Sequence, residues 1–132
     1  MFKAFTLTTD KEGMYRITDE VASVVHDSGI REGICVVFCP HTTGAITINE
    51  NADPDVKTDL MHGLNNVYPK LRAYRHMEGN SDAHLKSSCV GASEVLIVND
   101  GKLMLGIWQG IYFMEFDGPR NRTFYVKVIP SN

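Results

Sequence analysis

The segment between residues 94 and 108 constrains the fold of this chain more than any other. Two apolar runs, residues 94–98 and 102–108, flank the tripeptide Asn99-Asp100-Gly101. These three residue types tolerate the positive φ angles of tight turns, so the pattern is a strong signal for a β-hairpin. The segment therefore predicts two antiparallel strands, and a sheet that is largely antiparallel around them.

Other segments add strands and helices to this hairpin. Residues 34–39 form a continuous apolar run that is typical of a buried strand. Thr18 is a suitable N-cap for a helix over 18–28, and Gly29 is a natural stop. Asp53 followed by Pro54 predicts the start of an amphipathic helix that ends near residue 68. The remaining predicted elements are strands over 2–8, 45–48, 111–116 and 123–129, and a short helix that begins after Ser81 or Asp82 and runs to Cys89.

This set of elements predicts an α+β fold. We expect a mainly antiparallel sheet or sandwich of about seven strands with two or three helices, and strands joined mostly by hairpins. No linker or repeat divides the sequence, so residues 1–132 are expected to form a single domain.

Charge and hydropathy exclude several classes of protein. The net charge is −3 with a pI of about 5.9, which does not favour nucleic-acid binding. No apolar run approaches the roughly 20 residues of a membrane helix, and no signal peptide is visible, so we expect a cytoplasmic protein that does not bind membranes. Cys35 and Cys39 share a strand face, but their Cα atoms would lie ~13 Å apart, so we expect buried thiols rather than a metal pair.

Histidines carry the main chemical signal, because four of the five lie between positions 41 and 84. His41 opens a polar loop after a buried strand, where scaffolds often present functional side chains. His84 lies in the first turn of the short helix, and His76 lies in the loop before it. Each also has a structural interpretation, as a loop or helix histidine. His62 and His26 are expected to be solvent-exposed or structural.

Two carboxylates leave their roles open. Glu50 follows a predicted strand and is either a metal ligand, a general base or a surface acid. Glu115 lies in an apolar run. Strand alternation could place it on the outer face, whereas a buried Glu115 would need a partner such as Arg120.

Four longer motifs resemble the YjbQ-like family, which is also described as a secondary thiamine-phosphate synthase family. Residues 41–51 read HTTGAITINEN, residues 83–88 read AHLKSS after YRH at 74–76, residues 105–111 read LGIWQGI, and residues 115–120 read EFDGPR. The resemblance extends over nearly the whole chain. It departs at Ile107, where threonine is usual in the family.

The resemblance implies an α+β homotrimer with a metal site at a subunit cleft. By motif position the ligands would be His41, His76 and His84, holding a divalent ion, with zinc favoured and magnesium as the alternative. The implied activity joins hydroxymethylpyrimidine diphosphate to a thiazole phosphate and releases diphosphate. Two alternatives remain open: a metal-dependent hydrolase, and a non-catalytic trimeric module that binds a metal and a phosphorylated metabolite.

The resemblance and the residue chemistry together assign expected roles. Glu50, His41 and His84 are expected to be catalytic. The residues expected to contact phosphate or the rest of the substrate are Lys86, Ser87, Ser88, Trp108, Gln109 and Arg120.

Overall fold

The computed structural model describes residues 1–131 and confirms the α+β class. Within that part of the chain there are eight strands and three helices. They are β1 (Phe2–Thr9), β2 (Gly13–Arg16), α1 (Thr18–Ser28), β3 (Gly33–Phe38), β4 (Gly44–Glu50), α2 (Pro54–Val67), α3 (Ser81–Val90), β5 (Ser93–Asn99), β6 (Lys102–Leu103), β7 (Gln109–Glu115) and β8 (Arg120–Pro130).

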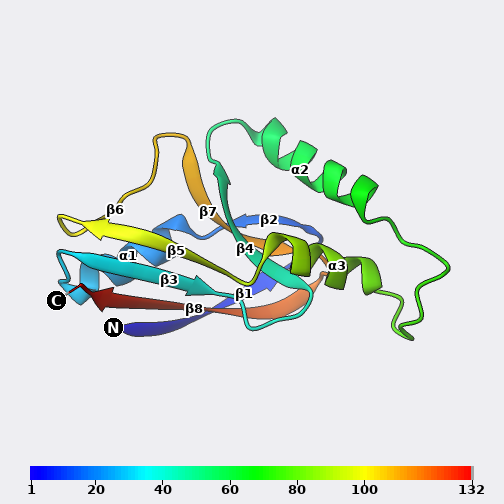
Figure 1. The fold of residues 1–132 in the computed structure, drawn as a ribbon, viewed down its shortest axis with the longest axis horizontal. Helices are drawn as coiled ribbons and strands as arrows, with labels where there is room; N and C mark the ends of the chain where they lie inside the picture. The colour runs from blue at the N-terminus through cyan, green and yellow to red at the C-terminus, as the bar shows by residue number, and fades with distance from the viewer. Residues whose placement is uncertain (132) are drawn as a thin grey trace.

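The strands form two sheets, as Figure 1 shows. The larger sheet has the order β1-β8-β3-β5-β6 and the smaller one the order β2-β7-β4. Every pairing is antiparallel, as predicted. The predicted hairpin connectivity is wrong, because β5 and β6 are the only consecutive strands that pair within the described residues. The chain instead crosses between the sheets, so strands distant in sequence, such as β1 and β8, lie side by side.

The predicted hairpin strand over 102–108 is much shorter in the structure. Strand β6 contains only Lys102 and Leu103, and Met104 N adds one bond to Ile97 O of β5 at 2.9 Å. Asp100 and Gly101 make the turn with positive φ angles of 53° and 76°. Residues 104–108 instead form an irregular loop with a turn closed by the bond from Gln109 N to Gly106 O, 3.0 Å. Strand β2 was not predicted, because four residues are too few to show a two-residue period.

Helix α1 covers the core between the sheets. Val21, Val24 and Val25 are buried, and Gly29 ends the helix in the left-handed region at φ 67°. The predicted N-cap role of Thr18 is wrong, because Ile17 holds that position and the Thr18 hydroxyl accepts a hydrogen bond from Ile111 N at 2.9 Å. Thr18 therefore joins α1 to β7.

Helix α2 starts as predicted but is only partly buried, with Met61 and Leu64 packed against a small apolar cluster. Asp53 accepts a hydrogen bond from Asp55 N at 2.9 Å, and Pro54 follows at the first helical position. The helix runs along the outside of the molecule (Figure 1), and no residue of it is fully buried. Val67, on its apolar face, remains 66% exposed.

The outer face of the larger sheet is also apolar and uncovered. Side chains alternate along β3 and β5, so that Cys35, Leu96 and their neighbours face the core while others face out. Among the outward side chains, Val95 is 58% and Ile97 64% exposed. A sheet that is apolar on both faces is typical of one covered on both sides.

No helix within residues 1–131 has the length and apolar character needed to cross a bilayer.

Candidate functional site

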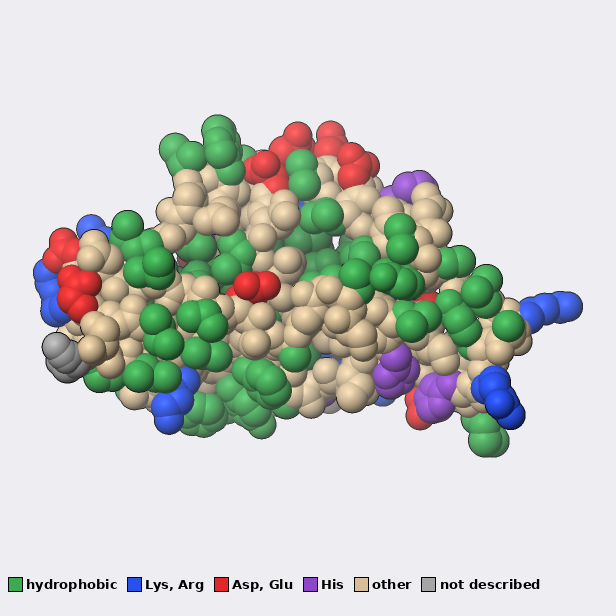
Figure 2. Space-filling model, in the orientation of Figure 1, with side chains coloured by type: hydrophobic (Ala, Val, Ile, Leu, Met, Phe, Trp, Pro, Cys, Tyr) green, Lys and Arg blue, Asp and Glu red, His purple; other side chains and the backbone are tan. Residues whose placement is uncertain are grey.

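A pocket of about 330 Å³ gathers the polar chemistry of the molecule at one end of the smaller sheet. It lies between the loop before β4, the loop that joins α2 to α3, the start of α3 and the start of β8. Figure 2 shows histidine side chains exposed at this end of the molecule. The lining residues are Thr42, Thr43, His76, Glu78, Asn80, His84, Arg120 and Arg122.

Two of the three predicted metal ligands meet in this pocket. His76 comes from the α2–α3 loop and His84 from the first turn of α3, and their ring centroids are 5.4 Å apart at an interplanar angle of 88°. The carboxylate of Glu78 lies 3.9 Å from His76 Nε2. Two imidazoles at this separation supply two nitrogen donors of the kind that zinc prefers.

His41, the third predicted ligand, is engaged elsewhere. Thr123 N donates a hydrogen bond to His41 Nε2 at 2.9 Å, so the ring proton lies on Nδ1 in the neutral imidazole. Burial, with a further contribution from the charge of Arg122, lowers the pKa of His41. Among residues 1–131, no three His, Cys, Asp or Glu side chains are arranged to hold a metal ion. The three-histidine site therefore remains a prediction. Within one chain, His76 and His84 lie together and His41 does not join them.

A buried ion pair forms the floor of the pocket. Glu115 is 0% exposed, so the outer-face interpretation is wrong, and its partner is Arg122 rather than Arg120. Arg122 Nε donates to Glu115 Oε1 at 2.7 Å, and Arg122 Nη2 donates to Glu115 Oε2 and to Thr43 Oγ1. Burial alone would raise the pKa of Glu115, but the hydrogen bonds from Arg122 and Thr9 outweigh it and lower the pKa.

Arg120 belongs to a second, more exposed network at the rim. It donates from Nη2 to Asp117 Oδ2 at 2.7 Å and from Nε to the Asp117 carbonyl at 2.9 Å. Asn80 Nδ2 donates to the same Asp117 oxygen at 2.7 Å. Burial would raise the pKa of Asp117, but the bonds from Asn80 and Arg120 lower it overall. Asp117 is therefore a fixed anion that orients both side chains at the pocket rim.

The predicted phosphate contacts on α3 lie outside the pocket. Lys86 is 1% exposed and donates to Asn65 and, at 3.2 Å, to Asp82, with Glu12 3.7 Å away. These groups occupy the ammonium donors of Lys86. The Ser87 hydroxyl donates to Gly44 O at 2.6 Å, whereas Ser88 is exposed. Lys86 and Ser87 therefore tie α3 to its neighbours in this chain.

Glu50, Trp108 and Gln109 lie at the opposite end of the smaller sheet. In the β4–β7 register, Gly44 pairs with Glu115 near the pocket, whereas Glu50 pairs with Gln109. Six residue steps along a strand span ~20 Å, so these three side chains do not reach the histidine pair of their own chain. Glu50 Oε2 accepts from Ala52 N at 2.9 Å, and Trp108 is 62% exposed.

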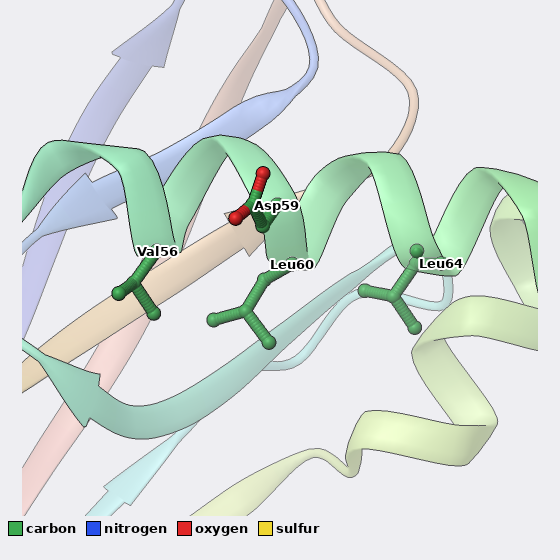
Figure 3. A pocket seen from close by; sticks show the side chains of 5 residues that line it. Val56, Asp59, Leu60 and Leu64 are labelled. Carbon is green, nitrogen blue, oxygen red and sulfur yellow. The ribbon is translucent and has the colours of Figure 1, made fainter.

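A second hollow lies along α2. It has a volume of about 390 Å³ and is lined by Val56, Asp59, Leu60, Gly63 and Leu64. Figure 3 shows the three aliphatic side chains on one side of the helix, with Asp59 turned away from them. A single carboxylate among aliphatic groups gives this hollow no catalytic chemistry, and it fits an apolar contact surface instead.

Sequence reasoning did not place Arg122, Thr43 or Asn80 in the site. Arg122 carried a usable signal, because it shares an inward-facing strand period with Phe124 and Val126. A charged residue on an apolar strand face implies a buried partner, and Glu115 is a second such residue on β7. Asn80 carried no signal beyond its position before a helix.

The fold and the pocket define an α+β domain of two antiparallel sheets, with a histidine- and arginine-lined pocket at one end of the smaller sheet. The sequence profile described as "UPF0047 protein YjbQ-like" matches residues 3–131. The chain therefore belongs to the YjbQ-like (UPF0047) family.

Individual relatives agree with this membership. The chain is 52% identical over 129 residues to a UPF0047 protein of Methanocaldococcus jannaschii, covering 98% of this chain and 94% of the relative. It is 55% identical over 123 residues to YugU of Bacillus subtilis, covering 92% and 93%. A crystal structure from Clostridium acetobutylicum superposes with a TM-score of 0.94 at 52% identity, covering 96% of this chain and 99% of the other. A Sulfolobus solfataricus structure superposes at 0.95 with 33% identity, covering 99% and 97%.

Proposed function

We propose that the protein is a metal-dependent transferase of the thiamine-phosphate-synthase type. The observation that carries the proposal is that His76 and His84 lie together, 5.4 Å between ring centroids, in a pocket that Arg120 also lines. Imidazoles suit a divalent transition ion, and a guanidinium suits phosphate oxygens. Zinc is the favoured ion on this ligand chemistry.

The charge balance of the pocket supports a metal that binds before the phosphorylated substrate. Two guanidinium groups, Arg120 and Arg122, stand against three carboxylates, Glu78, Glu115 and Asp117. With neutral imidazoles this leaves one net negative charge, which does not attract an anion. A divalent ion on the histidine pair would reverse the sign of that balance.

The proposed chemistry divides between the ion and the chain. A bound divalent ion supplies Lewis acidity toward a diphosphate leaving group. Arg120 would hold phosphate oxygens at the rim, with Asp117 fixing the orientation of its guanidinium. Burial and the charge of Arg122 lower the pKa of His41, and its Nε2 accepts the bond from Thr123 N, so the neutral ring keeps a proton on Nδ1 as a hydrogen-bond donor.

A homotrimer is part of this proposal, and two observations support it. Glu50, Trp108 and Gln109 lie ~20 Å along β4 and β7 from the histidine pocket, so they can join one site only across subunits. The outer face of the larger sheet exposes apolar side chains, including Val95 and Ile97, that another subunit would cover. The free cysteines agree with a reducing, cytoplasmic location.

Metal content is the first test of the proposal. Tag-free wild type, His84→Ala and the control His62→Ala would be supplemented with zinc, manganese or nickel and measured by elemental mass spectrometry. We expect about one ion per chain in wild type and in His62→Ala, and loss of the ion in His84→Ala. A wild type without bound metal in all three supplements contradicts the metal-dependent function.

Product analysis then separates the three candidate functions. Hydroxymethylpyrimidine diphosphate would be incubated with and without the thiazole phosphate, and products would be followed by ³¹P NMR. Diphosphate release that requires the thiazole partner supports the transferase. Release of phosphate without the partner supports a hydrolase, and tight binding without turnover supports the non-catalytic module.

A further inference from the structure

One nitrogen of the buried Arg122 guanidinium has no acceptor among residues 1–131. Its Nε and Nη2 atoms donate to Glu115, and Nη2 also donates to Thr43 Oγ1 at 2.9 Å and to Thr43 O at 3.3 Å. Within residues 1–131, no hydrogen bond engages Arg122 Nη1. In the same residues, Asn80 Oδ1 is the one fully buried side-chain polar atom that lacks a hydrogen-bond partner. Arg122 Nη1 also lacks a partner, so it is not fully buried and solvent reaches it.

Arg122 is one of the residues that line the pocket. Arg122 is only 4% exposed, and its place in the pocket lining shows where the side chain meets solvent. Because Nε and Nη2 are engaged, the two N–H groups of Nη1 are the donors that Arg122 can offer to a ligand. A buried, charged side chain thus presents a fixed pair of donors to the pocket that holds His76 and His84.

We propose that Arg122 is the anion anchor of the pocket, and that its Nη1 binds a tetrahedral oxyanion such as the terminal phosphate of a phosphorylated substrate. The inference rests on the proposed function and deepens it, because it names the group that recognises the phosphate. Arg120, whose side chain is 45% exposed, closes on the same anion from the rim.

The pairing with Glu115 is what makes Arg122 a selective anchor. Glu115 is itself held by the Thr9 hydroxyl at 2.7 Å and by Asp117 N at 2.9 Å, so the guanidinium plane is fixed from both sides. A preorganised donor loses little conformational entropy when the ligand binds. Because the pair is neutral overall, it attracts anions only at short range, and it therefore selects by geometry.

The test needs variants that preserve charge balance in the buried pair. Arg122→Lys keeps the positive charge but removes the planar fork and the Nη1 donors. The double variant Glu115→Gln/Arg122→Gln removes both charges and keeps hydrogen-bonding groups, and serves if Arg122→Lys fails to fold. Arg31→Gln is the matched control, because Arg31 is exposed and pairs with Asp100 away from the pocket.

Inorganic phosphate and diphosphate are the probes, titrated into the folded full-length protein with and without zinc by calorimetry. We expect the affinity for phosphate to fall about tenfold or more in the Arg122 variants, since each loses hydrogen bonds to a charged group. Zinc affinity and the Arg31→Gln control should stay unchanged. Near-ultraviolet circular dichroism would establish that each variant is folded.

The outcomes separate this inference from the proposed function. Phosphate affinity that is unchanged in a folded Arg122 variant overturns the anchor and leaves the metal-dependent transferase standing. Phosphate binding that depends on Arg122 in a protein that takes up no metal keeps the anchor and removes the metal-dependent function. A wild type that binds neither phosphate nor diphosphate, with or without zinc, overturns the anchor.

Discussion

The carboxylate of Glu115 and the guanidinium of Arg122 form a two-point ion pair inside the protein, with Nε to Oε1 at 2.7 Å and Nη2 to Oε2. The pair joins β7 of the smaller sheet to β8 of the larger one. It thereby fixes the two sheets to each other directly beneath the candidate site.

Removing one partner of this pair should destabilise the fold strongly. Glu115→Gln leaves the Arg122 charge buried without a counter-ion, and we expect a loss of about 3–5 kcal/mol in the free energy of unfolding. The measurement is urea denaturation followed by circular dichroism. Glu115→Gln/Arg122→Gln should recover most of the loss, and a single variant as stable as wild type would contradict the buried-pair interpretation.

His41 should make stability fall in mildly acidic solution. Burial lowers the pKa of His41 below its ordinary value of 6.5, so the unfolded chain binds the proton first as pH decreases. The contribution of His41 is therefore complete above pH 6.5 and is lost as pH falls toward the lower folded-state value. Urea titrations from pH 7.5 to 5 should show this loss in wild type, and His41→Asn should reduce it. The matched control is His62→Asn, which replaces an exposed histidine.

Lys86 should matter for stability through the contacts of its ammonium. Lys86→Met removes the partner of the buried Asp82 and the bond to Asn65 on α2, so we expect a loss of about 3 kcal/mol. Thermal melting would measure it, with the exposed Lys102→Met as control. Lys86→Met/Asp82→Asn should recover part of the stability. Equal melting temperatures for wild type and Lys86→Met would show that the network contributes little.

The three cysteines should react at very different rates. Burial raises the pKa of Cys35 to about 11 and raises that of Cys39, while Cys89 is exposed. Only the thiolate is nucleophilic, so iodoacetamide at pH 8 should label native protein at Cys89 alone. Intact mass before and after denaturation would show one label and then three. Rapid native labelling of Cys35 would be inconsistent with this burial.

The outer face of the larger sheet should control assembly. Ile97 is 64% exposed on that face, and Ile97→Lys would place a charge in any interface formed there. Size-exclusion chromatography with light scattering should show trimers for wild type and smaller species for the variant. If this face is not part of an interface, Ile97→Lys would change the free energy of unfolding by less than about 0.5 kcal/mol and would not change assembly. If the Ile97→Lys variant is still a trimer, the subunit interface lies on another surface, such as the α2 hollow.

Local signals in the sequence placed most elements but not their neighbours. The Asp53-Pro54 start of α2 and the Gly29 end of α1 are decided within a few residues, so they could be predicted. The pairing of β1 with β8 depends on how apolar faces from distant segments fit together, which no local pattern reports. Thr18 shows the same limit. Its hydroxyl accepts a hydrogen bond from Ile111 N of β7 and does not cap helix α1.

The candidate site was predictable to the extent that motifs marked it. The AHLKSS and YRH motifs located His84 and His76, which the fold brings together. Lys86 has the charge expected of a residue that binds phosphate. Its ammonium group instead donates hydrogen bonds to Asp82, four residues earlier on the same helix, and to Asn65. Tertiary contacts decide which charged group faces a ligand and which faces the protein. The strand period marked Arg122 as inward-facing, but it did not show that the side chain lines the pocket.

The β1–β8 pairing also bears on how the protein is made. Strand β8 lies between β1 and β3 in the larger sheet, but it is translated after every other strand. Until β8 is made, β1 has no partner in the larger sheet and β3 can pair only with β5, so each strand keeps an edge of unpaired backbone groups, a feature that promotes aggregation. The larger sheet can therefore be completed only when β8 has emerged and inserted between β1 and β3.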